Sequence, residues 1–184
     1  MGDGAKPRIP LLERDQVTPE VASVYDALLK TRGVVPNMFK TLAHTPALAL
    51  ATAGYLKALL SDGALPGFYK ELIATRLSVL LNSDYAIKAH ALSARQKGAT
   101  EAQVAAARGD IEDGSFTEAE KLGFRAAERL HRGASEITDE VFAELSRHFS
   151  EAQIVELIAT AAAFELFPRF VDGLRIPLTP PPKS

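Results

Sequence analysis

The side chains best suited to moving protons lie in residues 66–98, where Glu71 and His90 fall on consecutive predicted helices. The few polar residues around Glu71 recur at the spacing of one helix face, so we expect that face to meet His90. Histidine has a reference pKa of about 6.5 and can exchange a proton near neutral pH. Glu71 could orient the histidine ring or act as a second base, and its burial should raise the pKa of its carboxyl group. The pair predicts general acid/base chemistry.

The second of these helices carries further candidate groups near its start. Ser83 is predicted to be its N-cap, because a serine hydroxyl can accept a hydrogen bond from an unpaired backbone N–H. Ser83, Ala86 and His90 share one helix face at i, i+3 and i+7. Tyr85 could bind a substrate oxygen, and Ser83 could do so where the helix dipole favours an anion. Pro66 is predicted at the first helical position of the preceding helix.

Each candidate also has a structural interpretation. Glu71 and His90 could be a satisfied buried pair that only fixes the packing of two helices. Arg169 could bind a substrate carboxylate through its guanidinium group. Its i, i+4 spacing from Glu165 instead favours a structural ion pair. Pro168 lies between these two residues and is expected to bend or end their helix.

Hydrophobic residues recur at helical spacing along the chain, and no hairpin turn separates alternating apolar runs. The sequence therefore predicts an all-α fold, a single-domain helical bundle of about eight helices over residues 18–175. Thr18 and Pro19 should start the first helix, and Gly33 should end it. Residues 1–17 are predicted to be an extended N-terminal arm, and residues 176–184 a proline-rich, partly polyproline-like tail.

One acidic stretch, residues 109–114, invites comparison with a cation-binding loop. It lacks the full ligand spacing of a calcium loop, so an ordinary surface loop is the favoured interpretation. The histidines are scattered without metal-ligand spacing. We therefore predict no metal site.

The composition, 47% hydrophobic and 24% charged over 184 residues, is typical of a soluble globular protein. A formal net charge of −2 gives no electrostatic basis for nucleic-acid binding. The N-terminus has no apolar signal region, and no apolar run is long enough to span a membrane. A cytoplasmic protein is predicted. The absence of cysteine excludes disulfides and thiol chemistry.

The pattern Glu71, Ser83-Asp84-Tyr85-Ala86 and His90 resembles the alkylhydroperoxidase D branch of the carboxymuconolactone decarboxylase family. In that branch a glutamate is followed at this spacing by Cys-x-x-Cys and then by a histidine. Residues 34–46 (VVPNMFKTLAHTP) and 164–178 (FELFPRFVDGLRIPL) also resemble its hydroperoxidase-related members. The resemblance covers most of the chain and implies a homo-oligomer, a dimer, trimer or hexamer.

In this branch the resemblance implies peroxide reduction by a thiol relay, but Ser83 and Ala86 stand where the two cysteines would be. A hydroxyl and a methyl group cannot cycle through sulfenic acid and disulfide, so no thiol peroxidase is predicted. The two residues indicate either a natural member that uses the fold differently or a chain with its cysteines replaced. The family's lactone decarboxylases use acid/base residues without a cofactor, which is compatible with His, Glu, Ser and Tyr. The local motifs resemble them less, so their lactone substrate is not inferred.

Three functions follow as alternatives. The first is a cofactor-free small-molecule enzyme, a lyase, isomerase or decarboxylase, in which His90 and Glu71 transfer protons in a mostly apolar pocket. The second is an alkylhydroperoxidase D-like antioxidant scaffold made inactive by the loss or replacement of Cys-x-x-Cys. The third is a non-catalytic oligomeric binding protein. For the first function, the residues predicted to contact substrate are Ser83, Tyr85, Ala86 and Arg169.

Overall fold

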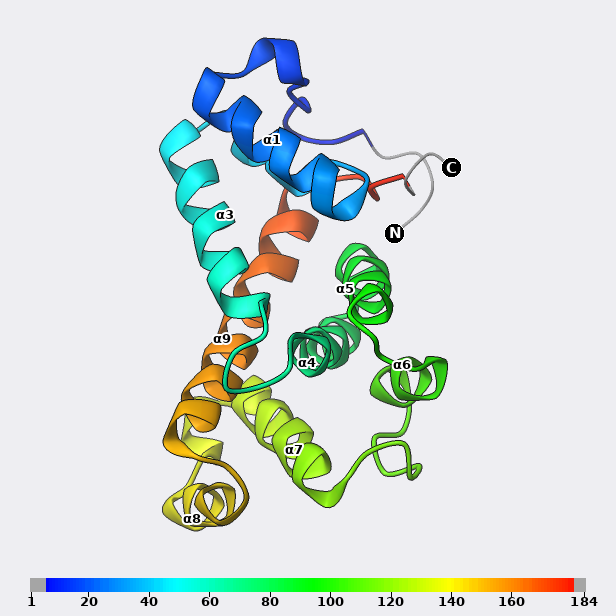
Figure 1. The fold of residues 1–184 in the computed structure, drawn as a ribbon, viewed down its shortest axis with the longest axis vertical. Helices are drawn as coiled ribbons and strands as arrows, with labels where there is room; N and C mark the ends of the chain where they lie inside the picture. Colours follow the sequence, from blue (N-terminus) through cyan, green and yellow to red (C-terminus); the bar gives the residue numbers. More distant parts are fainter. Residues whose placement is uncertain (1–5, 181–184) are drawn as a thin grey trace. The chain divides into compact units, whose positions relative to one another are not determined.

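A computed structural model of the chain describes residues 6–180, which form helices and turns without a strand (Figure 1). The predicted all-α fold class is confirmed. Across the described residues there are nine α-helices and two short 3-10 turns, Arg14–Gln16 and Ala134–Glu136. The helices are α1 Pro19–Arg32, α2 Asn37–Leu42, α3 Pro46–Leu60, α4 Gly67–Leu80, α5 Asp84–Gln96, α6 Glu101–Arg108, α7 Glu118–Arg132, α8 Asp139–His148 and α9 Glu151–Gly173.

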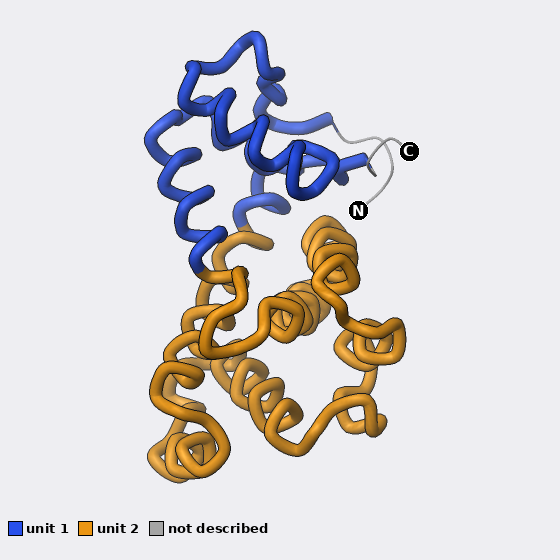
Figure 2. Tube along the Cα trace, viewed as in Figure 1, with its two compact units in different colours: residues 1–58, 170–184 blue, residues 59–169 orange. Residues whose placement is uncertain are grey.

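The chain divides into two compact units (Figure 2). Among the described residues, the first unit contains 6–58 and 170–180, and the second contains 59–169. The division falls within α3 and α9. The predicted single-domain boundaries at residues 18 and 175 stay a prediction. Both candidate proton-transfer residues, Glu71 and His90, belong to the second unit.

In the first unit, backbone groups of the N-terminal arm are paired with later segments. The Leu12 N–H donates to the Lys40 carbonyl at 3.1 Å, and the Tyr25 hydroxyl donates to the Leu12 carbonyl at 3.1 Å. The C-terminal segment is held by Asn37, whose side-chain amide donates to the Pro177 carbonyl at 3.1 Å. These bonds satisfy peptide groups that have no helix or sheet of their own.

Helix α4 forms the centre of the second unit, where it contacts α5, α6 and α7 (Figure 1). Leu72, Ile73 and Leu77 have no exposed surface. Burying a side chain of this size contributes roughly 1.5–3 kcal/mol, so α4 is a main source of stability in this unit. The Tyr69 ring packs edge-on against Phe124 of α7, with 5.3 Å between ring centroids.

Among the described helices, none combines the length and apolar character needed to cross a membrane.

The turn between α4 and α5 determines how the two helices face one another. Asn82 adopts a φ of 53°, in the left-handed region that asparagine tolerates. The Asn82 N–H donates to the Val79 carbonyl and the Ser83 N–H to the Ser78 carbonyl, each at 2.9 Å. This pair of bonds is a Schellman motif, which ends α4 and starts α5 almost immediately.

The start of α4 differs from its prediction. Pro66 is the N-cap, not the first helical residue, and its backbone is extended. The Gly67 N–H donates to the Asp62 carboxylate at 2.7 Å. That carboxylate caps the helix from the preceding turn, a tertiary contact that helix-start rules do not anticipate.

Gly123 on α7 lies so close to Tyr69 that a larger residue at this position should lower the stability of the protein. A methyl group there would overlap the Tyr69 hydroxyl, which is buried and donates to the Glu120 carbonyl at 2.6 Å. We expect Gly123→Ala to lower the free energy of unfolding by about 1–3 kcal/mol, because overpacking exceeds the gain in helix propensity. Chemical denaturation followed by circular dichroism measures this difference.

The matched control is Gly54→Ala, the same change inside helix α3. A methyl group at Gly54 would have no neighbour within 4 Å, so only helix propensity should act. We expect stabilisation by about 0.5–1 kcal/mol. Tyr69→Phe should also relieve part of the Gly123→Ala effect, since it removes the overlapped oxygen. Equal effects at the two glycines would contradict the packing argument.

Candidate acid/base site

Glu71 and His90 are brought together by the turn between α4 and α5, after which the two helices pack against each other. Nδ1 of His90 lies 2.7 Å from Oε2 of Glu71. The His90 side chain is 13% exposed, whereas that of Glu71 is fully buried. The His90 ring also packs edge-on against Phe164 of α9, with 4.3 Å between ring centroids. The predicted meeting of the glutamate face with the histidine is therefore confirmed.

The second carboxylate oxygen of Glu71 has two donors that the sequence interpretation missed. The Ser93 hydroxyl and the Lys97 ammonium each donate to Oε1 at 2.7 Å. The Lys97 ammonium also donates to the Leu60 carbonyl at 2.7 Å. A signal for both was present, because His90, Ser93 and the C-cap residue Lys97 recur at i, i+3 and i+7, the spacing of one helix face.

These donors reverse the predicted pKa change of Glu71. Burial acts to raise the pKa, as expected, but the hydrogen bonds and positive charges of His90 and Lys97 outweigh it. The result is a pKa lowered from 4.5 to about 2. The prediction of a raised pKa was therefore wrong. With this pKa, Glu71 is an anion at neutral pH.

Three of the four predicted substrate contacts lie at the start of α5. Ser83, Tyr85 and Ala86 are all buried, with exposed fractions of 9% or less. Ser83 is the N-cap residue, as predicted, but its hydroxyl accepts no capping hydrogen bond. Within the described part of the chain, Oγ of Ser83 has no hydrogen-bond partner. Such a buried hydroxyl is unusual and suits a contact with a bound molecule.

Arg169, the fourth, follows its structural interpretation. Its guanidinium group lies 2.7 Å from the Glu165 carboxylate, and the Arg169 side chain is 60% exposed. The same carboxylate lies 2.7 Å from Nδ1 of His131 on α7. Pro168 does not end the helix, because α9 continues to Gly173. The ion pair leaves Arg169 engaged with α9 and gives it no observed contact with Glu71 or His90.

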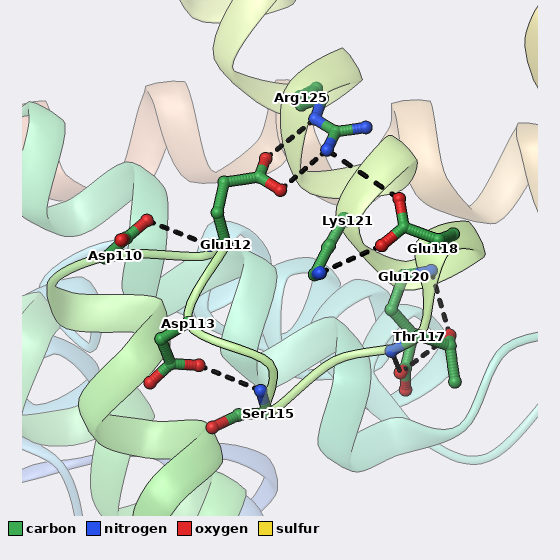
Figure 3. Close-up of polar contacts among 9 residues, drawn as sticks. All are labelled: Asp110, Glu112, Asp113, Ser115, Thr117, Glu118, Glu120, Lys121 and Arg125. Carbon is green, nitrogen blue, oxygen red and sulfur yellow. Dashed lines mark hydrogen bonds and ion pairs between the residues drawn. The ribbon is translucent and has the colours of Figure 1, made fainter.

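The acidic loop before α7 is held by its own contacts (Figure 3). Carboxylates of Asp110 and Asp113 accept backbone hydrogen bonds from Glu112 and Ser115, each at 2.9 Å. Glu112 forms two hydrogen bonds with Arg125, at 2.8 and 2.7 Å. Among residues 6–180 there is no group of three or more His, Asp or Glu placed to hold a metal ion. The local bonds favour the interpretation as an ordinary loop.

Comparison with known proteins gives one family and one fold. Residues 46–129 match the carboxymuconolactone decarboxylase family. No curated protein matches the chain. Among solved structures, the alkylhydroperoxidase AhpD core of an uncharacterized peroxidase-related protein from Ralstonia eutropha JMP134 is similar, with a TM-score of 0.87 and 21% identity over 96% of this chain and 94% of that one.

Two further structures are similar over nearly their whole length. A peroxidase-related protein from Silicibacter sp. TM1040 has a TM-score of 0.85 and 20% identity, covering 98% of this chain and 95% of that one. An alanine-for-cysteine variant of the debrominase Bmp8, in complex with 2,3,4-tribromopyrrole, has a TM-score of 0.83 and 22% identity, covering 96% and 94%. At such identities the likeness establishes the AhpD-like helical fold.

Proposed function

We propose that this chain, which belongs to the carboxymuconolactone decarboxylase family, is a cofactor-independent enzyme that moves a proton on a small molecule. His90 would be the acid/base group, and Glu71 would hold it in place. The observation that carries this proposal is the 2.7 Å contact between Nδ1 of His90 and Oε2 of Glu71. An ionised carboxylate at this position accepts the Nδ1 proton and so selects one tautomer of the ring.

This tautomer leaves the Nε2 lone pair of His90 as the base. In the proposed step, Nε2 takes a proton from a carbon next to a conjugated carbonyl, and the electron pair of the broken C–H bond moves into that carbonyl. The imidazolium then returns the proton, so the reaction has no net redox change. Glu71 stabilises the imidazolium that forms, as the acidic member of a catalytic triad does.

The surroundings of His90 suggest the class of substrate. Phe164 lies against the ring, and Tyr85 and Ala86 are buried on the same helix as His90. These apolar neighbours support a small and mainly apolar molecule as the substrate. The debrominase variant holds 2,3,4-tribromopyrrole in the same fold, which supports a small cyclic ligand for this chain. Oγ of Ser83, buried without a partner among the described residues, would donate to a substrate oxygen.

Deuterium exchange tests the proposal even while the product of the reaction is unidentified. Small molecules retained by the purified protein would first be identified by mass spectrometry. Those molecules, together with cyclic carbonyl compounds and carboxylated lactones, would then be incubated with the protein in D₂O. We expect the wild-type protein to introduce deuterium at the acidic carbon of at least one compound and His90→Gln to lose this activity. Exchange at the wild-type rate in His90→Gln would exclude the proposed role.

The alternative, a peroxidase scaffold without its thiols, has support from the AhpD-like fold and from the buried positions of Ser83 and Ala86. It makes a separate prediction. In Ser83→Cys/Ala86→Cys, the start of α5 would favour thiolate character, and His90 would remain to move protons. We then expect dithiothreitol-dependent consumption of hydrogen peroxide. The control is Ser83→Cys alone, which cannot form the disulfide. A double variant without activity would contradict this alternative.

A further inference from the structure

The end of α5 holds a cation against the acid/base pair. Lys97 is the C-cap residue, and Gly98 follows with a φ of 102°, a conformation that favours glycine. The Ala99 N–H donates to the Ala94 carbonyl at 2.9 Å, which completes a Schellman motif around Lys97. The backbone of Lys97 is therefore fixed, and its side chain extends toward α3 and α4.

The Lys97 ammonium donates hydrogen bonds to two acceptors that carry full or partial negative charge. One is Oε1 of Glu71, and the other is the carbonyl of Leu60, the last residue of α3, each at 2.7 Å. The C-terminal end of a helix carries partial negative charge, so α3 favours a cation at this place. The Lys97 side chain is 30% exposed, which leaves it less screened than a surface lysine.

We propose that Lys97 sets the protonation state of His90 by neutralising the carboxylate that the two residues share. This inference rests on the proposed function, because it concerns the base that would carry the chemistry. With Lys97 present, the charge of ionised Glu71 is balanced, and the three side chains carry no net charge when the His90 ring is in its basic form. Without Lys97, the same group carries a buried negative charge, which attracts a proton to His90 and fills the lone pair of Nε2. Lys97 is thus a positioning residue that acts on the base through Glu71.

Uncharged groups also contact Glu71, His90 and Lys97. Titratable groups come from α4 and α5, and the packed elements α3 and α9 contribute a backbone carbonyl and an aromatic ring. Glu71 hydrogen-bonds two titratable residues, His90 and Lys97. Ser93 donates a neutral hydrogen bond to Glu71, and Phe164 presents an uncharged ring to His90.

The test is an NMR titration of the His90 ring, read from its ¹⁵N shifts, which also report the tautomer. We expect Lys97→Met to raise the pH midpoint of the ring by about one unit or more, the usual effect of unmasking a carboxylate within hydrogen-bond distance. Lys97→Arg keeps the charge and should restore the wild-type midpoint. Lys88→Met, an exposed change on the same helix, is the matched control and should leave it nearly unchanged. An unchanged or lowered midpoint in Lys97→Met would overturn the inference.

Two further variants keep the test decisive. Lys97→Gln removes the charge but retains a donor for the Leu60 carbonyl, so it gives the same measurement if Lys97→Met does not fold. In Glu71→Gln/Lys97→Met the carboxylate is absent, and the rise should disappear. Because the midpoint is read without substrate, it separates two failures. If His90→Gln loses deuterium exchange but Lys97→Met leaves the midpoint unchanged, only the role of Lys97 is overturned. If Lys97→Met raises the midpoint but His90→Gln keeps its exchange activity, only the proposed function is overturned.

Discussion

Replacing Glu71 with glutamine is expected to lower the free energy of unfolding at pH 7 by about 3 kcal/mol. The pKa of the Glu71 carboxyl falls from 4.5 to about 2 on folding. At about 1.4 kcal/mol for each pH unit, this fall corresponds to about 3 kcal/mol of preference for the ionised form. An amide cannot supply that charge, and it leaves His90 and Lys97 with a poorer acceptor in a buried place. Urea denaturation at pH 7 measures the loss.

The matched control is Glu101→Gln, the same change in an exposed ion pair. Glu101 is 76% exposed and lies 2.6 Å from Arg95. Exposed pairs of this kind contribute up to about 1 kcal/mol, because water and salt screen them. If both substitutions cost the same, the buried carboxylate would have no special part in stability.

The pH dependence of stability provides an independent check. The folded pKa of Glu71 lies below the unfolded value, so its stabilisation is complete above about pH 4.5 and is lost as the pH falls toward 2. The difference in unfolding free energy between wild type and Glu71→Gln should therefore shrink over this range. A difference that stayed constant from pH 5 to pH 2 would contradict the lowered pKa.

The helices could be predicted from the sequence where local interactions determine them. Thr18 caps α1 through its side chain, and Gly33 ends that helix with a φ of 71°, both as predicted. Predictions failed where a contact with residues outside the helix determines where the helix begins or ends. Pro66 became an N-cap because Asp62 supplies the cap, and Pro168 is accommodated within the long helix α9. Residue type and spacing carry no direct information about such tertiary compensation.

For the candidate site, the sequence indicated the pair but not its electrostatics. The helical spacing of Glu71 and His90 was enough to place them on facing surfaces. The pKa of Glu71 depended instead on how many donors converge on its carboxylate. Ser93 and Lys97 share the His90 face of α5, yet their contact with Glu71 depends on the turn at Asn82, which fixes the register of the two helices. Burial alone therefore gave the wrong sign.

The second large effect concerns catalysis. Once deuterium exchange has identified a substrate, we expect His90→Gln to lower kcat/KM by about 10²–10⁴-fold, the usual contribution of a positioned acid/base group. Glutamine can still donate a hydrogen bond to Glu71, so the packing of α4 against α5 should survive. It has no titratable nitrogen, so the limb of the pH–rate profile that reports the base should disappear together with the rate.

A structural role for His90 would give a different pattern, and the control separates the two. His148 is 40% exposed near the end of α8, and His148→Gln should leave both rate and pH profile unchanged. Ser93→Ala removes one of the donors to Glu71 and leaves the His90 ring intact, so it should lower kcat less than His90→Gln. If His90 only fixed helix packing, its loss would lower stability while kcat/KM of the folded protein kept its pH dependence. If His90→Gln folds stably and its pH–rate profile lacks the limb that reports the base, the function of the ring is proton transfer.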